Sequence, residues 1–140
     1  MNPAWIWLPV LLHVLLCLYL YGMLGVVKAR AYKAREVDRK RSAIHADAWP
    51  ASVIKVNNNI RNQFETPVLF YVLVVAVVIF DGVNAFSVGF AWLFVATRYA
   101  HAFIHTSSNY VPIRFRIFAI GLVALVGLLG GAGYSVIQAM

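Results

Sequence analysis

The chain has few acidic residues and little charge of any kind. Of its 140 residues only 5 are Asp or Glu and 12 are Lys or Arg, so charged residues make up 12% of the sequence. Hydrophobic residues make up 62%. A soluble domain of this length could not bury so much apolar surface. The scarcity of charge therefore excludes a soluble globular protein and predicts a membrane protein.

Cysteine is nearly absent as well. Cys17 is the only one, so no intrachain disulfide can form, and membrane thiol oxidoreductases that work through paired cysteines are excluded. We interpret Cys17 as a small buried hydrophobe within its helix. No metal site is predicted either. His101 and His105 have i, i+4 spacing, but no Asp, Glu or Cys nearby on that segment completes a ligand set.

Long apolar runs are what the sequence has in abundance. Four segments are long enough, or nearly so, to cross a hydrocarbon core of about 30 Å as helices. They are residues 5–27, 57–80, 85–108 and 113–137, with residues 28–55 as the one long connection. Strands would be shorter and would alternate in polarity. The first segment lacks a preceding basic region and exceeds a signal-peptide core, so we expect it to be retained. The sequence thus predicts an all-α, integral membrane four-helix bundle, in a single domain over residues 1–140.

The positive charges are distributed unequally between the two ends of this bundle. Residues 28–55 carry eight Lys or Arg against three Asp or Glu, whereas the turn at 81–84 and both termini carry no Lys or Arg. By the positive-inside rule the long loop is cytoplasmic and both termini are non-cytoplasmic. The net charge of +7 is therefore no evidence for nucleic acid as a partner. Topology alone explains it, and a basic loop beside a bilayer meets anionic lipid headgroups.

The second apolar segment begins with a dense polar cluster. Its apolar part, residues 67–80, has only 14 residues, fewer than the about 20 that a span requires, so its polar start must be drawn into the membrane. Asn58, Arg61, Asn62 and Glu65 follow i, i+3, i+4, i+7 spacing, which predicts that one helix face carries all four. Ionisable groups at such depth are costly and indicate a functional site.

A second set of polar residues is expected at the same depth. Counting 1.5 Å per residue from the non-cytoplasmic edge of the bilayer places Glu65 at a depth of about 22 Å and Arg98 at a depth of about 20 Å. Arg98, His101 and His105 follow i, i+3, i+7 spacing and share a helix face. The side chains expected in this layer or at its cytoplasmic rim are Lys28, Arg61, Asn62, Glu65, Arg98, His101, His105 and Arg114. Together they predict one polar site in the inner leaflet.

Three explanations of this layer compete. A structural polar core would pair Glu65 with Arg61 in its own helix, or with Arg98 in the next, and so fix helix register. A proton-coupled transporter would need an unpaired membrane carboxylate, whereas Glu65 has arginines at its own level. A ligand site is favoured by the charge count. Three arginines and two histidines face one carboxylate, and this surplus of positive charge predicts an anionic ligand.

At these residues the sequence resembles a known family. The run Arg61–Glu65, with Pro67 and the run Leu69–Tyr71, resembles the second-helix signature of the membrane-associated proteins in eicosanoid and glutathione metabolism (MAPEG). The Arg98–His101 pattern, followed by Pro112–Arg114, is similar to that family's third-helix end and fourth-helix start. The four-helix layout, the chain length and the long first loop match too, so the resemblance covers nearly the whole chain.

The resemblance implies a homotrimer of four-helix subunits in a lipid bilayer, with glutathione bound as co-substrate between neighbouring subunits near the cytoplasmic side. It suggests a bacterial-type member, located in the inner membrane, acting on a lipophilic small molecule. By matched position the glutathione contacts would be Arg61, Asn62, Glu65, Arg98, His101 and Arg114, with Lys28 and His105 as further candidates. Arg114 is the expected catalytic residue, because it begins a helix whose free N–H groups add positive potential for a thiolate.

The sequence departs from the prostaglandin synthase-like members at four positions. Asn58 stands where they carry a second Arg, and His105, Phe115 and Phe118 stand where they carry Tyr, Ser and Tyr. The missing hydroxyls argue against prostaglandin-type isomerisation. We therefore expect a membrane glutathione transferase or peroxidase acting on lipophilic electrophiles or lipid hydroperoxides. The alternative is a non-catalytic trimer that binds and presents a lipid.

Overall fold

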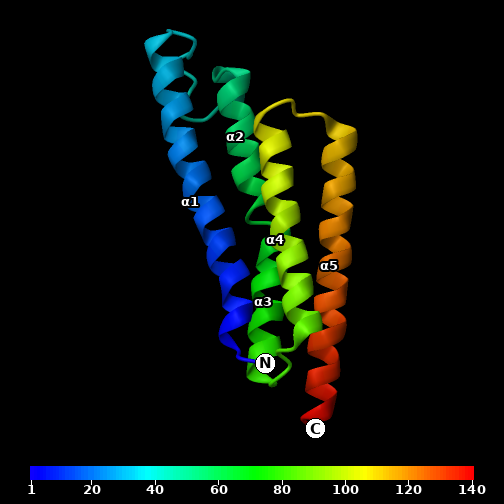
Figure 1. Cartoon of the computed structure of the whole chain (residues 1–140). Helices are drawn as coiled ribbons and strands as arrows, with labels where there is room; N and C mark the ends of the chain where they lie inside the picture. Colours follow the sequence, from blue (N-terminus) through cyan, green and yellow to red (C-terminus); the bar gives the residue numbers. More distant parts are fainter.

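The computed structural model describes residues 1–140 and is built of helices alone (Figure 1). The elements in chain order are α1 (Ala4–Lys33), the one-turn 3-10 helix η1 (Ala46–Ala48), α2 (Ala51–Asn62), α3 (Thr66–Ile79), α4 (Ala85–Thr106) and α5 (Val111–Gln138). Both termini lie at one end of the bundle, and the α1–α2 and α4–α5 connections lie at the other (Figure 1). α2 and α3 follow one another along one line and together form the second span. The predicted all-α four-helix bundle is therefore confirmed.

Three stretches are long and apolar enough to cross a membrane, namely Ala4–Lys33, Ala51–Ile79 and Val111–Gln138. The remaining helix, α4, has 22 residues, or about 33 Å at 1.5 Å per residue. That length also matches a hydrocarbon core of about 30 Å. The charged and imidazole side chains in its last turns lower its hydropathy. Length and composition thus support three of the four predicted spans, and length alone supports the fourth.

The helices extend beyond the predicted membrane spans, and local chemistry explains where they begin and end. α1 continues to Lys33, six residues past the predicted end of the span, through a stretch of good helix formers. α2 begins at Ala51 rather than at residue 57. Pro50 precedes it in an extended conformation, which suits a residue at the start of a helix. The connection between α1 and α2 is therefore shorter than the predicted residues 28–55, and both helices project beyond the apolar part of the bundle.

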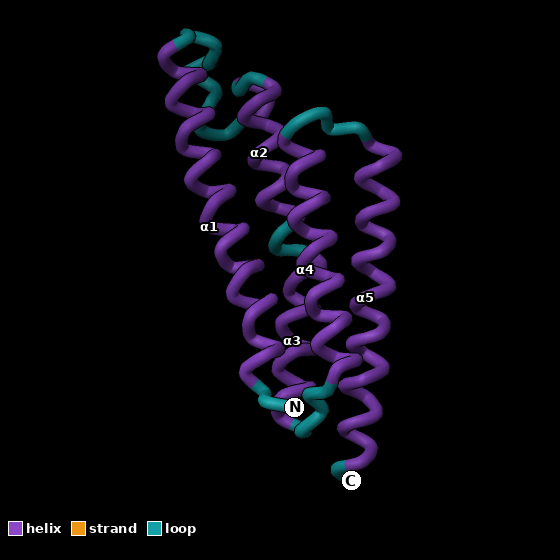
Figure 2. The backbone as a smooth tube through the Cα atoms, viewed as in Figure 1, coloured by secondary structure: helices purple, strands orange, loops and turns teal.

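The second span is not one continuous helix. α2 ends at Asn62, α3 begins at Thr66, and Figure 2 shows loop backbone between them. Pro67 explains the break, because it lacks an N–H group and its ring clashes with the carbonyl four residues earlier, that of Gln63. Glu65 has φ −94° and ψ −90° and lies outside either helix. The prediction that one helix face carries Glu65 together with the α2 residues is therefore wrong.

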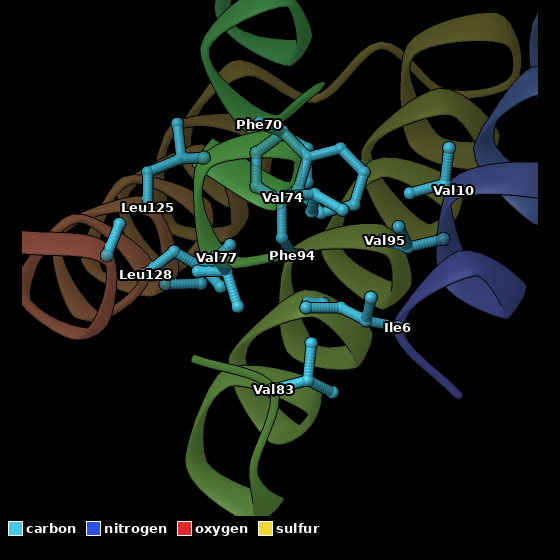
Figure 3. Packing of buried hydrophobic residues seen from close by; sticks show 13 residues of the cluster. Ile6, Val10, Phe70, Val74, Val77, Val83, Phe94, Val95, Leu125 and Leu128 are labelled. Carbon is cyan, nitrogen blue, oxygen red and sulfur yellow. The ribbon is translucent and has the colours of Figure 1, made fainter. Parts of the chain in front are cut away.

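The main apolar core fills the half of the bundle that holds the termini. At its centre the rings of Phe70 in α3 and Phe94 in α4 stack with centroids 4.7 Å apart (Figure 3). A smaller cluster lies beyond the break and joins α1, α2 and α4 through Leu16, Leu20, Val56, Ile60 and Ala102. α5 packs against α4 and α3, whereas α2 packs against α1 and α4. Beyond the break, α2 and α5 are therefore not packed closely on each other.

The turn between α3 and α4 is fixed by a capping box. The Asn84 side chain accepts hydrogen bonds from the backbone N–H groups of Phe86 and Ser87, and the Ser87 hydroxyl accepts one from the backbone N–H of Asn84. Gly82 packs so closely that an added Cβ would lie 2.1 Å from the Ser135 hydroxyl in α5. This tight end holds α4 in register with α5, so the polar residues of both helices reach the opposite end at matching heights.

Candidate functional site

A polar cleft lies between the last turns of α2 and α4 and the first turn of α5. One part is a cavity of about 380 Å³ lined only by polar residues, namely Asn58, Arg61, Asn62, Glu65, His105, Asn109 and Arg114. The other part is a cavity of about 240 Å³ lined by Asn62, His101, Val111, Arg114, Phe115 and Phe118. The two cavities share Asn62 and Arg114, and we call them together the polar cleft. Six of the eight residues that the sequence singled out line it.

Helix ends place these side chains. Arg61 and Asn62 occupy the last turn of α2, and Arg114 occupies the first turn of α5, whose Pro112 suits a helix start. His101 and His105 lie one turn apart in α4, with ring centroids 5.6 Å apart. The break after α2 places Glu65 at the same cleft although it has left the helix. The site thus combines three chain segments that are far apart in sequence.

Two hydrogen bonds organise the cleft wall. An Arg114 guanidinium N–H group donates to the side-chain oxygen of Asn109, and the amide of Asn62 lies 3.4 Å from Nδ1 of His105. Asn109 has φ 56°, a left-handed conformation that Asn tolerates better than most residues. Sequence reasoning missed Asn109. The available signal was an Asn after two Ser residues at the end of a helix, which is typical of a left-handed turn.

The cleft carries more positive than negative charge. Arg61 and Arg114 face one carboxylate, Glu65, and Arg98 lies close behind. The ion pairs that a structural polar core would need are absent. The one salt bridge in the chain joins Arg41 and Asp47 in the α1–α2 connection. Glu65 is exposed and pairs with neither Arg61 nor Arg98 within its own chain. The geometry therefore argues against a purely structural reading of this layer.

Buried nitrogen atoms without a hydrogen-bond partner gather at the same place. In the whole chain three buried side-chain atoms have none, and they are Nε of Arg98, Nδ1 of His101 and Nε of Arg114. An unsatisfied buried polar group costs about 1–3 kcal/mol, so native proteins contain few of them. Their concentration in and beside one cleft indicates that an oxygen-rich ligand would be stabilised there.

Arg98 does not line the cleft itself. Its side chain is 1% exposed and lies between the rings of Phe94 and Phe118, at 5.3 and 5.4 Å from their centroids. Its one hydrogen bond goes to the Thr66 hydroxyl and is long, at 3.4 Å. Since Phe118 lines the cleft, Arg98 lies directly behind that wall. Its charge acts on the cleft from within the bundle rather than by direct contact.

Lys28 lies outside the cleft of its own subunit. Its ammonium group is 4.7 Å from the centroid of the Trp49 ring, in a separate cavity of about 200 Å³ that also contacts Asn57 and Asn58. α1 packs on the side of α2 that faces away from α5, which explains this placement. Asn58 lines both cavities, so it separates the Lys28 site from the polar cleft.

An apolar cavity of about 450 Å³ lies on the other face of α4, against α1. Its lining residues are Leu15, Leu16, Tyr19, Leu20, Tyr99, Ala102, Phe103 and Thr106. It contains no Arg, Lys, His, Asp or Glu, and the hydroxyl-bearing residues in its lining are Tyr19, Tyr99 and Thr106. Its lining suits an apolar chain, whereas the charged and imidazole side chains gather at the polar cleft.

Fold and site together define a class of protein, a helical membrane bundle with a cationic polar cleft at one end. The sequence model of the MAPEG family matches residues 7–134. The chain therefore belongs to the MAPEG family, and the predicted resemblance is confirmed. It is an integral, multi-pass membrane protein in a family that includes glutathione transferases and peroxidases as well as non-catalytic members. No curated protein and no solved structure matches the chain.

Proposed function

We propose that this protein is a membrane-embedded glutathione transferase or peroxidase that acts on lipophilic electrophiles or lipid hydroperoxides. One observation carries the proposal. All three buried nitrogens without a partner lie in or directly behind a cleft whose cationic side chains outnumber its one carboxylate. A ligand with several anionic oxygens would balance the surplus positive charge, and it could contact His101 and Arg114, which line the cleft. Glutathione is such a ligand, and MAPEG proteins often use it.

The charges of glutathione match the residues of the cleft. Glutathione has two carboxylates and one ammonium group. The planar guanidinium groups of Arg61 and Arg114 can each bind a carboxylate in a bidentate manner. Glu65 is the one acid in the cleft and can accept from the ammonium group. The Asn62 amide and the two histidines supply further polar contacts around the peptide. The arrangement supports binding of the whole tripeptide rather than of a simple anion.

Arg114 is the proposed catalytic residue. It lies in the first turn of α5, where free backbone N–H groups add positive potential. A guanidinium group in this position favours the thiolate of glutathione over the thiol. In the transferase reaction the thiolate sulfur attacks the electrophilic carbon of a lipophilic substrate. The C–S bond forms as the leaving group departs with its electron pair.

The assembly and topology are part of the proposal. Residues 1–140 would form one four-helix subunit, and three subunits would make a homotrimer with glutathione between neighbours. The long loop would face the cytoplasm and both termini the opposite side, in the inner membrane of a bacterium. The common end shared by the two termini supports placing both on one side of the membrane (Figure 1). The excess of Lys and Arg in the long loop supports placing that loop in the cytoplasm. In such a trimer Lys28 of a neighbouring subunit would be a candidate ligand contact. A periplasm-active reporter fused after Met140 should be active, and a silent reporter would contradict the topology.

A non-catalytic lipid-binding trimer is the second candidate function. Two observations favour it. Phe115 and Phe118 line the cleft with rings that bring no hydroxyl group to the reaction. The mainly apolar cavity between α1 and α4 could hold an acyl chain, and no charged residue lines it. Under this alternative the polar cleft would bind glutathione or a lipid headgroup without turnover.

Assay of the purified protein in detergent separates these functions. Wild type is incubated with glutathione and a chlorinated aromatic compound or a lipid hydroperoxide, and product is followed by absorbance. Turnover that is lost in Arg61→Ala and Glu65→Ala, but kept in Arg116→Ala, would support the enzyme. Arg116 is exposed and lines neither part of the polar cleft, which makes it a matched control. Glutathione binding without turnover would favour the lipid-binding alternative, and no glutathione binding would refute both uses of the site.

The role of Arg114 has its own readout. Bound glutathione absorbs in the near ultraviolet when its thiol is ionised. With glutathione at saturating concentration, Arg114→Ala should lose this thiolate signal, whereas Arg116→Ala should retain it. An unchanged signal in Arg114→Ala would assign thiol activation to another group.

A further inference from the structure

A buried chain of hydrogen bonds crosses the bundle next to the polar cleft. The Tyr71 hydroxyl lies 2.6 Å from Nδ1 of His13, and Nε2 of His13 lies 3.1 Å from the side-chain oxygen of Gln63. The Gln63 amide donates to the side-chain oxygen of Asn59 at 3.0 Å, and the Asn59 amide donates to the carbonyl of Ala102 at 3.3 Å. The chain joins α1, both sides of the break, and α4. His13 in α1 therefore lies at the level of the break, beside the residues that lead into the polar cleft.

All the hydrogen bonds in this series donate in the same direction, from Tyr71 toward Ala102. The Ala102 carbonyl can only accept, so the Asn59 amide donates to it and the Asn59 oxygen is left to accept from Gln63. The Gln63 oxygen then accepts from His13, in the tautomer with its proton on Nε2, and Nδ1 accepts from the hydroxyl of Tyr71. His13 and Asn59 are 0% exposed and Gln63 is 1% exposed. Aligned bonds in a site of low dielectric strengthen one another.

Gln63 is the residue that links this series of hydrogen bonds to the polar cleft. It follows Asn62 directly and precedes Glu65 by two residues, and both of those line the polar cleft. Successive residues at a helix end point about 100° apart, since there are 3.6 residues per turn. Holding the Gln63 side chain toward α1 therefore turns Asn62 toward α5. Pro67 determines where the helix breaks, but a proline leaves open the direction in which the freed residues turn.

We propose that His13 is a positioning residue for the polar cleft. By holding the Gln63 side chain from α1, it fixes the path of residues 63–65 and so presents Asn62 and Glu65 to a bound ligand. The bond from Arg98, at 3.4 Å, holds Thr66 in the first turn of α3 and contacts none of residues 63–65. The identity of the ligand rests on the proposed function, whereas the restraint on the break does not.

A merely structural role for His13 makes a different prediction. Polar contacts between membrane helices stabilise the bundle, and their loss would then lower stability without any specific effect on the cleft. The discriminating variants are His13→Leu, which removes both hydrogen bonds, and His13→Gln, whose amide can donate to Gln63 while its oxygen accepts from Tyr71. Leu128→Ala is the matched control, because Leu128 is 0% exposed and lies in the apolar core of α5, away from the cleft.

Two readouts test the proposal in detergent. Calorimetry measures the Kd of glutathione, and hydrogen–deuterium exchange measures protection of the amides of residues 64–66 without ligand. His13→Leu should raise Kd about tenfold or more, the effect of misplacing a hydrogen bond to a charged ligand group. It should also speed exchange at residues 64–66. His13→Gln should recover most of the affinity. Leu128→Ala should lower the unfolding temperature while leaving Kd and local exchange unchanged.

The outcomes separate this proposal from the proposed function. If wild type binds glutathione and His13→Leu binds it equally well with unchanged exchange, the positioning role is refuted and the function stands. If wild type does not bind glutathione, the function fails, and exchange alone decides the positioning role. Faster exchange at residues 64–66 in His13→Leu but not in Leu128→Ala supports it, and equal exchange overturns it. Should His13→Leu not fold, Gln63→Met removes the same hydrogen bond from the other side, and unchanged exchange at residues 64–66 in that variant would also overturn the proposal.

Discussion

Replacing Arg98 by Met should make the protein without ligand more stable. Arg98 is 1% exposed and has no acidic partner. Its favourable contacts are one long hydrogen bond, worth about 0.5–1.5 kcal/mol, and two aromatic rings, each worth about 0.5–2 kcal/mol. Against them stand the burial of a charge, which costs several kcal/mol, and an unpartnered Nε, which costs about 1–3 kcal/mol.

Methionine is close enough in length to fill the same space between the two rings, and it buries no charge. Replacing buried ionic groups with apolar residues stabilises proteins by about 1–4 kcal/mol in measured cases. For a chain of this size 1 kcal/mol corresponds to about 3–4 °C in Tm. We therefore expect the Tm of Arg98→Met to rise by roughly 3–16 °C in the absence of glutathione.

Thermal unfolding in detergent, followed by circular dichroism, measures this change. Arg116→Met is the control, because Arg116 is exposed and its replacement should change stability by less than about 0.5 kcal/mol. A lower Tm for Arg98→Met than for wild type would show that the charge is compensated within the subunit. The argument that the cationic layer is built for an external anion would then lose its main energetic support.

Three further predictions concern the scaffold and the loop. Gly121→Ala should lower the free energy of unfolding by about 1–3 kcal/mol, because its Cβ would lie 2.8 Å from the Thr97 hydroxyl. Gly22→Ala, with no atom within 4 Å, should be neutral or stabilising by up to about 1 kcal/mol, and denaturant titration of both variants would test the contrast. Asn84→Ala should cost about 1 kcal/mol by removing the capping box of α4, and a loss near zero would contradict the assigned cap. In the loop, the hydrogen bond from Arg41 lowers the pKa of Asp47. The pair therefore contributes at pH values above the ordinary carboxyl pKa of about 3.9, and its contribution is lost as the pH falls through the lower folded value. Titration by NMR should show the Asp47 pKa returning to the ordinary value in Arg41→Ala, and no change would disprove the assignment.

Much of the fold could be predicted from composition and spacing. Sparse charge and long apolar runs indicate helices in a membrane, because only helices and closed barrels satisfy their backbone groups there. Pro112 marked the start of α5, since proline fits the beginning of a helix, and Pro50 stands directly before α2. The spacing of His101 and His105 was enough to predict that both lie on one face of their helix, because α4 is unbroken over that stretch.

The errors arose where the chain leaves regular structure. Counting residues along a helix assumes that the helix continues, and it stops doing so at Gln63. Glu65 reaches the cleft through the break rather than along a helix face. Lys28 was expected at the rim of the site from its depth along the bundle. Depth alone does not say on which side of the bundle a side chain lies. Trp49, which comes from a loop, holds Lys28 on the side away from α5.

The sequence by itself determined the class and the helical spans, because these follow from hydropathy and periodicity. The break in the second span was recognised only in the structure, although the missing N–H of Pro67 explains it. Only the tertiary structure decided which side chains face one another across the cleft. That choice depends on contacts between residues far apart in the chain, such as His13 with Gln63, 50 positions away, and Asn62 with His105, 43 positions away. Local preferences act over a few residues, so they specify the helices, whereas the packing of α1, α4 and α5 around the break turns its polar residues toward one site.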